Sequence, residues 1–398
     1  MRAEASSELG ALPSYRLSEL VSYALKLGTT GFGGPVALVG YMHRDLVEHR
    51  KWISEEQYRE GLALAQLAPG PLAAQLAIYL GYVHYRILGA TLVGAAFVLP
   101  SFLIVVALGW AYVRYGGLPW IQAVFYGVGA AVIGIIANSA YKLTKKTLGR
   151  DNLLWFIYLV SAVLTVVTES EIVWLFLGAG VLTWLVRAPP KNWFSKNISP
   201  AVAALPVDPH TVVALFPALD WNQLLQIGIF FAEAGAFVFG SGLAIVPFLY
   251  GGVVNEYHWL NDRQFLDAVA VALITPGPVV ITVGFIGYLV AGFPGAVVAA
   301  LATFLPCYLF TVIPAPYFSK YGKLAGVKAF VDGVTAAAIG TIAGAVVVLG
   351  ERSIIDLATA VMALLTLVAL LKFKKLPEPV LVAVAAVLGI ALFPIMRP

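Results

Sequence analysis

The tripeptide Pro-Gly-Pro occurs twice in this chain, at 69–71 and 276–278, and the residues around it repeat with it. At a shift of 207 residues, Phe32-Gly33 matches Phe239-Gly240 and Trp52 matches Trp259. Beyond one deleted residue the shift becomes 206, and it relates Gly81 to Gly287, Pro100 to Pro306, Gly127 to Gly333 and Gly134 to Gly340. So many matches in one register indicate an internal duplication. We therefore predict two repeats, over 1–190 and 221–398, joined by a linker over 191–220.

Each repeat contains apolar runs long enough to cross a bilayer, which takes about 20 residues. The runs lie at about 17–40, 89–113, 119–141, 152–168 and 171–187, and again at about 222–250, 293–317, 327–350, 354–371 and 377–396. With 60% hydrophobic and 12% charged residues and a mean hydropathy of +0.88, the chain differs sharply from soluble proteins. We therefore predict an all-α polytopic membrane protein.

Cations are distributed oppositely in equivalent loops. One loop of the first repeat carries four cations, Arg44, Arg50, Lys51 and Arg59, whereas its counterpart in the second repeat carries only Arg263 beside acidic residues. Conversely, a loop of the second repeat carries Lys372, Lys374 and Lys375, whereas its counterpart around Glu169 carries no cation. Because cations favour the cytoplasmic side, the repeats should be antiparallel, with inverted topology. Inversion requires an odd number of crossings per repeat. About ten transmembrane helices plus two re-entrant Pro-Gly-Pro-broken hairpins satisfy it, with both termini outside.

The segment from Thr29 to Pro35 holds three glycines and a proline, which a regular helix accommodates poorly. One interpretation is a helix that ends near Thr30, followed by a half-helix that starts at Pro35 and offers its N–H groups to an anion. A kinked, closely packed helix is the alternative.

The two Pro-Gly-Pro turns, in 58–88 and 264–291, each remove two backbone donors. Irregular backbone at membrane depth must face protein or a water-filled cavity. Interrupted helices at equivalent places in two repeats favour a transporter's binding site, and a purely structural turn is the alternative. We expect free N–H groups at both turns, with the first turn the more important.

Polar side chains close to these breaks are further candidates. Lys26 precedes the glycine break and Glu233 takes its place in the second repeat. Charges inside a membrane usually face a cavity or each other, although Lys26 alternatively extends to the interface. The basic stretch 43–51 is favoured as a topology anchor over an anion-recruiting surface.

The first-repeat motifs resemble the chromate ion transporter family in its long, two-domain form. They are Phe32-Gly33-Gly34-Pro35, Met42-His43-Arg44, Trp52-Ile53-Ser54, Pro69-Gly70-Pro71 and Gln75-Leu76-Ala77. The second repeat adds Phe239-Gly240-Ser241-Gly242, Trp259-Leu260 and Pro276-Gly277-Pro278. The resemblance covers roughly 17–350 and implies an inner-membrane protein that exports chromate, often alongside sulfate chemistry. It also implies that function is concentrated in the first repeat. Two positions depart from the family pattern: Gly240-Ser241-Gly242 replaces Gly-Gly-Pro, and Glu233 stands where related repeats have lysine.

We therefore expect a secondary transporter that exports chromate across the cytoplasmic membrane and confers chromate resistance. A sulfate importer or exchanger and an anion channel remain alternatives on the same scaffold. We expect no enzyme activity, cofactor, metal or nucleic-acid partner, and a homodimer is left open. The predicted substrate-binding residues are Lys26, Phe32, Gly33, Gly34, Pro35, His43, Arg44, Gln66, Pro69, Gly70, Pro71, Gln75, Glu233, Gly240, Ser241, Gly242, Pro276, Gly277 and Pro278.

Overall fold

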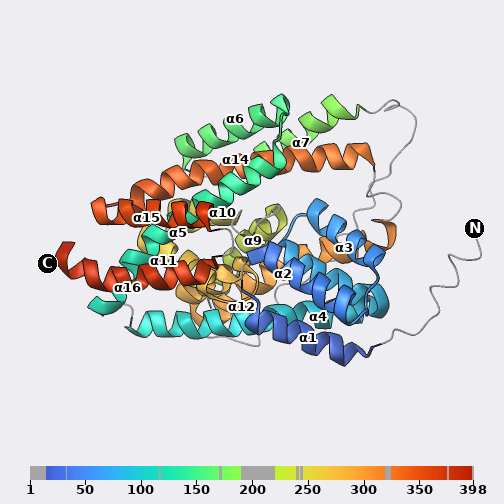
Figure 1. The fold of residues 1–398 in the computed structure, drawn as a ribbon, viewed down its shortest axis with the longest axis horizontal. Helices are drawn as coiled ribbons and strands as arrows, with labels where there is room; N and C mark the ends of the chain where they lie inside the picture. The colour runs from blue at the N-terminus through green and yellow to red at the C-terminus, as the bar shows by residue number, and fades with distance from the viewer. Residues whose placement is uncertain are drawn as a thin grey trace, which may run out of the picture.

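The computed structural model describes residues 15–32, 34–115, 118–169, 173–189, 220–238, 242, 245–318, 324–373 and 376–396. Within these ranges every regular element is a helix, which confirms the all-α prediction (Figure 1). Four helices are long and apolar enough to cross a membrane, namely Leu72–Tyr115, Trp120–Thr147, Val279–Tyr317 and Ala325–Ser353. Shorter apolar helices cover Asn152–Thr168, Trp174–Arg187, Leu357–Lys372 and Glu378–Pro394.

Each repeat opens with a helix that ends at the glycine break. In the first repeat these elements are α1 (Leu17–Thr30), α2 (Gly34–Met42) and the π-helix η1 (His43–His49). In the second they are α9 (Trp221–Phe237), α10 (Ile245–Tyr250) and the π-helix η3 (Gly251–Glu256). The break near Thr30 and the new helix at Pro35 are thus confirmed.

The chain reverses direction at this break, so single spans over 17–40 and 222–250 were wrong predictions. The Tyr23 hydroxyl of α1 donates to Asp45 of η1 at 3.3 Å, and Arg50 lies over the Tyr23 ring. In the second repeat, Phe230 of α9 packs in the same way against Tyr257, just beyond η3. Gly34, with φ +73°, adopts a conformation that favours glycine and permits the reversal.

The Pro-Gly-Pro turns form the tips of two helical hairpins, as predicted. The first joins α3 (Glu55–Leu67) to α4 (Leu72–Tyr115), and the second joins α11 (Asp262–Ile274) to η4 (Val279–Ile281) and α12 (Thr282–Val312). Ser54 and Asn261 cap α3 and α11 in equivalent capping boxes, which fix where both helices start. Gly61 of α3 packs against the Tyr79 ring of α4, so the two legs of the first hairpin lie side by side.

Helices α4 and α12 each fold back on themselves at equivalent kinks. The kinks lie at Arg86 (φ 50°) and Gly292 (φ 62°). Gly81 packs against Gly89 across the first kink, and Gly287 packs against Gly295 across the second. The short first leg of each helix thus belongs to a hairpin, and the second leg is one of the long apolar spans.

The last two helices of each repeat pack against a helix of the other repeat. The helices involved are α5 (Pro119–Thr147), α6 (Asn152–Thr168) and α7 (Val173–Arg187), with the counterparts α14 (Ala325–Ser353), α15 (Leu357–Lys372) and α16 (Glu378–Met396). Helices α6 and α7 pack against α14 of the second repeat, while α15 and α16 pack against α5 of the first (Figure 1). The repeated glycines serve these contacts: Gly340 packs on Tyr158 of α6, and Gly134 packs on Ala363 of α15.

The equivalent helices α5 and α14 run in opposite directions. Tyr126, near the start of α5, donates to Asp356, just beyond the end of α14, at 2.6 Å. Further along α5, Ile133 lies beside Gly350, which precedes the end of α14.

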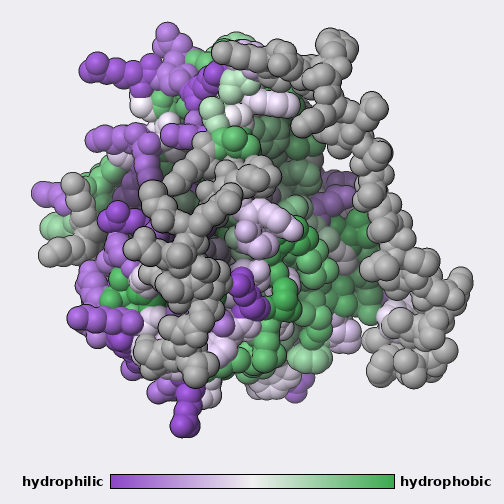
Figure 2. Space-filling view, turned by 90° about the vertical axis from the view of Figure 1, so that its right-hand side faces the viewer, coloured by the Kyte–Doolittle hydropathy of each residue, from purple (hydrophilic) through white to green (hydrophobic). Residues whose placement is uncertain are grey.

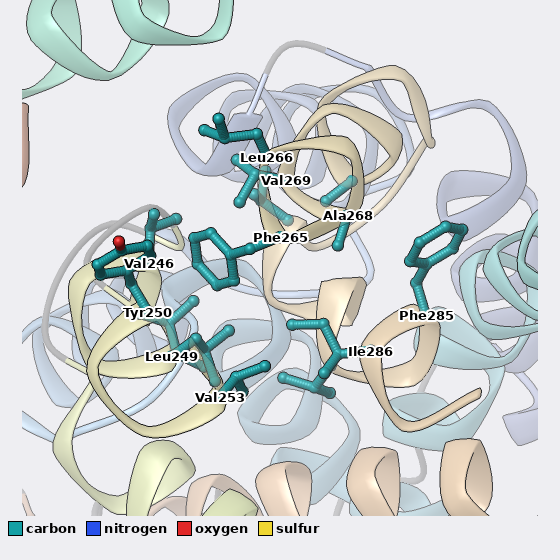
Figure 3. Packing of buried hydrophobic residues seen from close by; sticks show 14 of the residues in the cluster. Val246, Leu249, Tyr250, Val253, Phe265, Leu266, Ala268, Val269, Phe285 and Ile286 are labelled. Carbon is teal, nitrogen blue, oxygen red and sulfur yellow. The ribbon is translucent and has the colours of Figure 1, made fainter. Parts of the chain in front are cut away.

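A large apolar core joins the hairpins of the second repeat. Tyr250 and Val253 from α10 and η3 point toward Phe265 of α11, and Ile286 of α12 lies on the other side (Figure 3). All of these side chains are buried. This core holds α11 on nearly every side, with α5, α12 and α16 packed around it.

The start of α1, the end of η1 and the start of α3 lie at one end of the molecule. Tyr15 stacks on Trp52 at 4.8 Å between ring centroids, and Arg50 lies over the Trp52 ring. Helix α1 starts near the right-hand end in Figure 1, and α16 ends at the left-hand end. A scheme with Arg50 inside and both termini outside is therefore wrong for the start of α1. Seen from that right-hand end, hydrophilic side chains gather over part of the face, with apolar side chains beside them (Figure 2).

Candidate functional site

Each Pro-Gly-Pro turn contacts the glycine break of the other repeat. The Gly70 N–H donates to the Val238 carbonyl at 2.5 Å, and the Gly277 N–H donates to the Gly31 carbonyl at 2.9 Å. Val238 follows α9 as Gly31 follows α1, so the two bonds are equivalent and reciprocal. Such reciprocity is the mark of a two-fold relation. We call this region, defined by Gly31, Gly70, Val238 and Gly277, the junction.

The Gly70 and Gly277 N–H groups are themselves paired across the junction, so they are not among the free N–H groups expected at the turns. Beyond each turn a helical segment starts, at Leu72 in α4 and at Val279 in η4. The N–H groups of a first helical turn have no acceptor within their own helix. The N–H groups that can face an anion are therefore those after the turns.

The turn carbonyls are satisfied by different side chains. The Gln75 amide Nε2 donates to the Pro69 carbonyl at 2.7 Å, within the first repeat. The Ser101 hydroxyl of α4 donates to the Pro276 carbonyl at 2.7 Å, across the repeats. Ser101 is not among the predicted site residues, although its counterpart at the 206-residue shift, the buried Cys307, flanks Gly70. The second turn is thus held to the other repeat by two hydrogen bonds, one that Gly277 donates to Gly31 and one that Pro276 accepts from Ser101.

Gln75 also carries an unsatisfied acceptor. Its side chain is fully buried, and its Oε1 has no hydrogen-bond partner among the described residues. A buried polar atom without a partner is costly and calls for an explanation. The Gln75 Oε1 can still accept a hydrogen bond from a donor at the first turn.

The predicted site residues differ in how far the structure buries them. Lys26, Gln66 and Glu233 are exposed positions of α1, α3 and α9, and the Phe32 side chain is 40% exposed. The remaining turn residues Pro71, Pro276 and Pro278 are buried, and Pro69 is half-buried. Pro35 lies in the first turn of α2, and Gly242 is buried against Val279 and Val280. Gly33, Gly240 and Ser241 lie outside the described residues.

His43 and Arg44 lie away from the turns, in η1 at the far end of the first hairpin. His43 pairs with Glu55 at 2.8 Å and with Glu48, and Arg44 pairs with Asp45 at 2.9 Å. The His43 hydrogen bond, followed by that of Arg59, lowers the pKa of the exposed Glu55 carboxyl. The Arg44 guanidinium and the His43 ring are both engaged by carboxylates of the same region.

The two hairpins differ in how far they are enclosed. Along α11, residues 265–273 are buried without interruption. The equivalent stretch of α3 is interrupted by exposed or half-buried positions, including Arg59 and Gln66. The first hairpin therefore lies at the edge of the molecule. Among the described residues, no group of three His, Cys, Asp or Glu side chains could hold a metal ion.

Comparison with known proteins gives a consistent result. The family model described as "Chromate transporter" matches residues 18–184 and 225–390. The chain is 71% identical to a chromate transport protein of Cupriavidus metallidurans over 99% of its length and 97% of that protein. It is 65% identical to a probable chromate transport protein of Synechococcus elongatus, over 97% of this chain and 98% of that one. A chromate transport protein of Pseudomonas aeruginosa is 31% identical over 85% of this chain and 82% of its own. No solved structure matches.

Proposed function

Because the chain belongs to the chromate transporter family, a family of multi-pass membrane transporters, we propose that it exports chromate across the cytoplasmic membrane as a secondary transporter. Full-length identity of 71% to a chromate transport protein is the observation that carries the choice of cargo. Export of this oxyanion would confer chromate resistance on the cell.

We infer an inverted topology, with two repeats over 1–190 and 221–398. The antiparallel course of α5 and α14 supports it, as do the reciprocal bonds at the junction. The two family matches fall one within each repeat. The cation-rich end that contains Arg50 is placed in the cytoplasm because cations favour that side.

The junction is the proposed oxyanion site, as expected where broken helices of two inverted repeats meet. Its parts are the N–H groups that lie after Pro71 and Pro278 and before Gln75 and Ile281, whose own N–H groups donate to the two proline carbonyls. The positive ends of the helix dipoles lie behind them. Helix ends stabilise an anion by about 0.3–1 kcal/mol each when exposed and up to about 2 when partly buried. Binding of that strength holds a dianion while still permitting its release.

Driving force is available without ATP. The sequence contains no Gly-x-x-x-x-Gly-Lys-Ser/Thr phosphate loop. Export of a dianion from a negative-inside cell is favoured by about 2.3 kcal/mol per charge per 100 mV.

The test is flux of labelled chromate into inside-out membrane vesicles. Vesicles with the protein should accumulate chromate faster than vesicles without it, and unlabelled chromate should compete. Unlabelled sulfate added to a parallel sample reports whether the site accepts other tetrahedral dianions. No difference between the two vesicle preparations would reject the proposed export.

A further inference from the structure

The second hairpin buries a carboxylic acid that the anion site does not use. Asp267, in the middle of α11, is 3% exposed. The Tyr112 hydroxyl of α4 donates to its Oδ2 at 2.7 Å. Arg263, one turn earlier on α11, donates instead to the Gln122 carbonyl of α5 at 3.3 Å. Asp267 thus has a neutral hydroxyl as its hydrogen-bond partner rather than a cation.

An ionisable side chain at membrane depth is expensive and usually serves a function such as proton transfer. The Asp267 carboxyl interacts with two other ionisable groups, through a hydrogen bond from Tyr112 of α4 and through the charge of Arg263 on α11 itself. Of the ionisable residues on other helices packed against α11, Arg352 of α14 pairs with Asp262 and Glu378 of α16 lies near Lys142. The described part of α12 has no Asp, Glu, Lys, Arg or His.

The same position is acidic in the first hairpin. Glu60 is the counterpart of Asp267 at the 207-residue shift, and it interacts with the Tyr79 hydroxyl of α4. Each hairpin therefore carries one acid ten residues before its turn glycine, beside a tyrosine hydroxyl. With inverted repeats, the two acids lie toward opposite ends of the molecule.

We propose that Asp267 is a proton-binding residue whose protonation is coupled to movement of the oxyanion at the second Pro-Gly-Pro turn. This inference rests on the proposed transport function. Asp262 and Arg352 mark the nearby end of the molecule, so Asp267 lies one to two helical turns from water on the side proposed to be external. An ionised carboxylate only accepts hydrogen bonds, whereas a protonated one also donates.

Protonation at Asp267 therefore changes the contact between α11 and α4. Helix α11 is continuous from Asp267 to Ile274, just before the turn. A change at Asp267 is transmitted along it to Gly277, which is bonded to Gly31 of the first repeat. A proton entering from outside and an oxyanion leaving from inside would thus use the same hairpin.

The test compares two transport modes of the purified protein in liposomes. Chromate counterflow, at equal pH on both sides, measures exchange and needs no net proton movement. Chromate accumulation driven by an imposed pH gradient measures coupling. For Asp267→Asn, whose amide oxygen still accepts the Tyr112 hydrogen bond, counterflow should stay near the wild-type rate and gradient-driven accumulation should fall by about tenfold or more. Asp332→Asn, at a half-exposed acid paired with Arg187, is the matched control and should keep both modes.

If Asp267→Asn keeps gradient-driven accumulation, the inference is overturned. If the Asn variant loses both modes, Asp267→Glu decides: recovery of both modes supports a titrating role, and continued loss of both overturns it. Failure of the wild-type protein to show any chromate counterflow would reject the proposed function and this inference with it. Counterflow in the wild type, with coupling unchanged in Asp267→Asn, rejects this inference alone.

Discussion

At the scale of single residues, the junction depends on positions that have no room for a larger side chain. Gly277 has φ +98°, and a Cβ there would overlap the Ser101 hydroxyl. Gly70 has φ +138°, and a Cβ there would lie 2.7 Å from Gln75 Nε2 and 3.2 Å from Cys307 Cβ. Both turns therefore need glycine for conformation and for space.

Gly277→Ala should destabilise the protein by about 1–3 kcal/mol, because the new methyl group collides with Ser101 and the backbone is strained. Ser101→Ala alone should cost about 1 kcal/mol through the lost bond to Pro276. The double variant should lose less than the sum of the two, since one change removes the collision that the other creates. Thermal unfolding in detergent measures all three, and strictly additive losses would contradict the contact.

Lys26→Ala should weaken chromate transport strongly and Lys26→Arg less so if the exposed face of α1 borders the anion pathway. Arginine keeps the positive charge, so the pair separates charge from shape. Vesicle flux at matched expression is the measurement. Equal, near-wild-type rates in both variants would mean that Lys26 only extends to the membrane interface.

Only some of the residues that meet at the junction could be predicted from the sequence. The turns themselves were found because proline and glycine signal a helix break wherever they stand. Ser101 was not found, because a serine in an apolar helix usually bonds its own helix and nothing in the sequence points it at Pro276. Its repeat relation to Cys307, beside the other turn, was the available signal.

At the scale of elements, the sequence predicted where helices end better than where the chain goes next. The break after Thr30 and both Pro-Gly-Pro hairpins were predicted correctly. The reversal at Gly34 was not, because glycine permits several directions and tertiary contacts such as Tyr23 with Asp45 select one.

Arg187 is one of the residues that tie the helix pair α6–α7 to the other repeat. Arg187, at the end of α7, pairs with Asp332 of α14 at 2.8 Å and with Asp151, the cap of α6. Arg187→Met should lower stability by about 1 kcal/mol, as expected for partly exposed pairs, and more at low salt than at high salt. Lys145→Met, at an exposed position near the end of α5, is the control for loss of a positive charge. The measurement is the thermal unfolding of both variants at two salt concentrations. Equal losses of stability, with equal salt dependence, in Arg187→Met and Lys145→Met would contradict this role of Arg187.

At the scale of the whole molecule, the arrangement of ends is directly testable. Cysteines introduced at Ser18 and Arg50 should react with an impermeant maleimide from one side of the membrane, and those at Asn255 and Glu351 from the other. The buried native Cys307 should stay unlabelled in intact protein and serves as the background control. Labelling of Arg50→Cys and Asn255→Cys from the same side would end the inverted-repeat proposal.

The exchange of terminal helices also determines the order in which the protein can assemble. Helices α6 and α7 leave the ribosome long before α14, the helix against which they pack, has been synthesised. The first repeat therefore cannot complete its packing during translation, and its apolar faces wait in the membrane for the second. Quality control in the cell will meet this half-finished intermediate in every round of synthesis, and a chain truncated before α14 should be degraded rather than persist as a stable half.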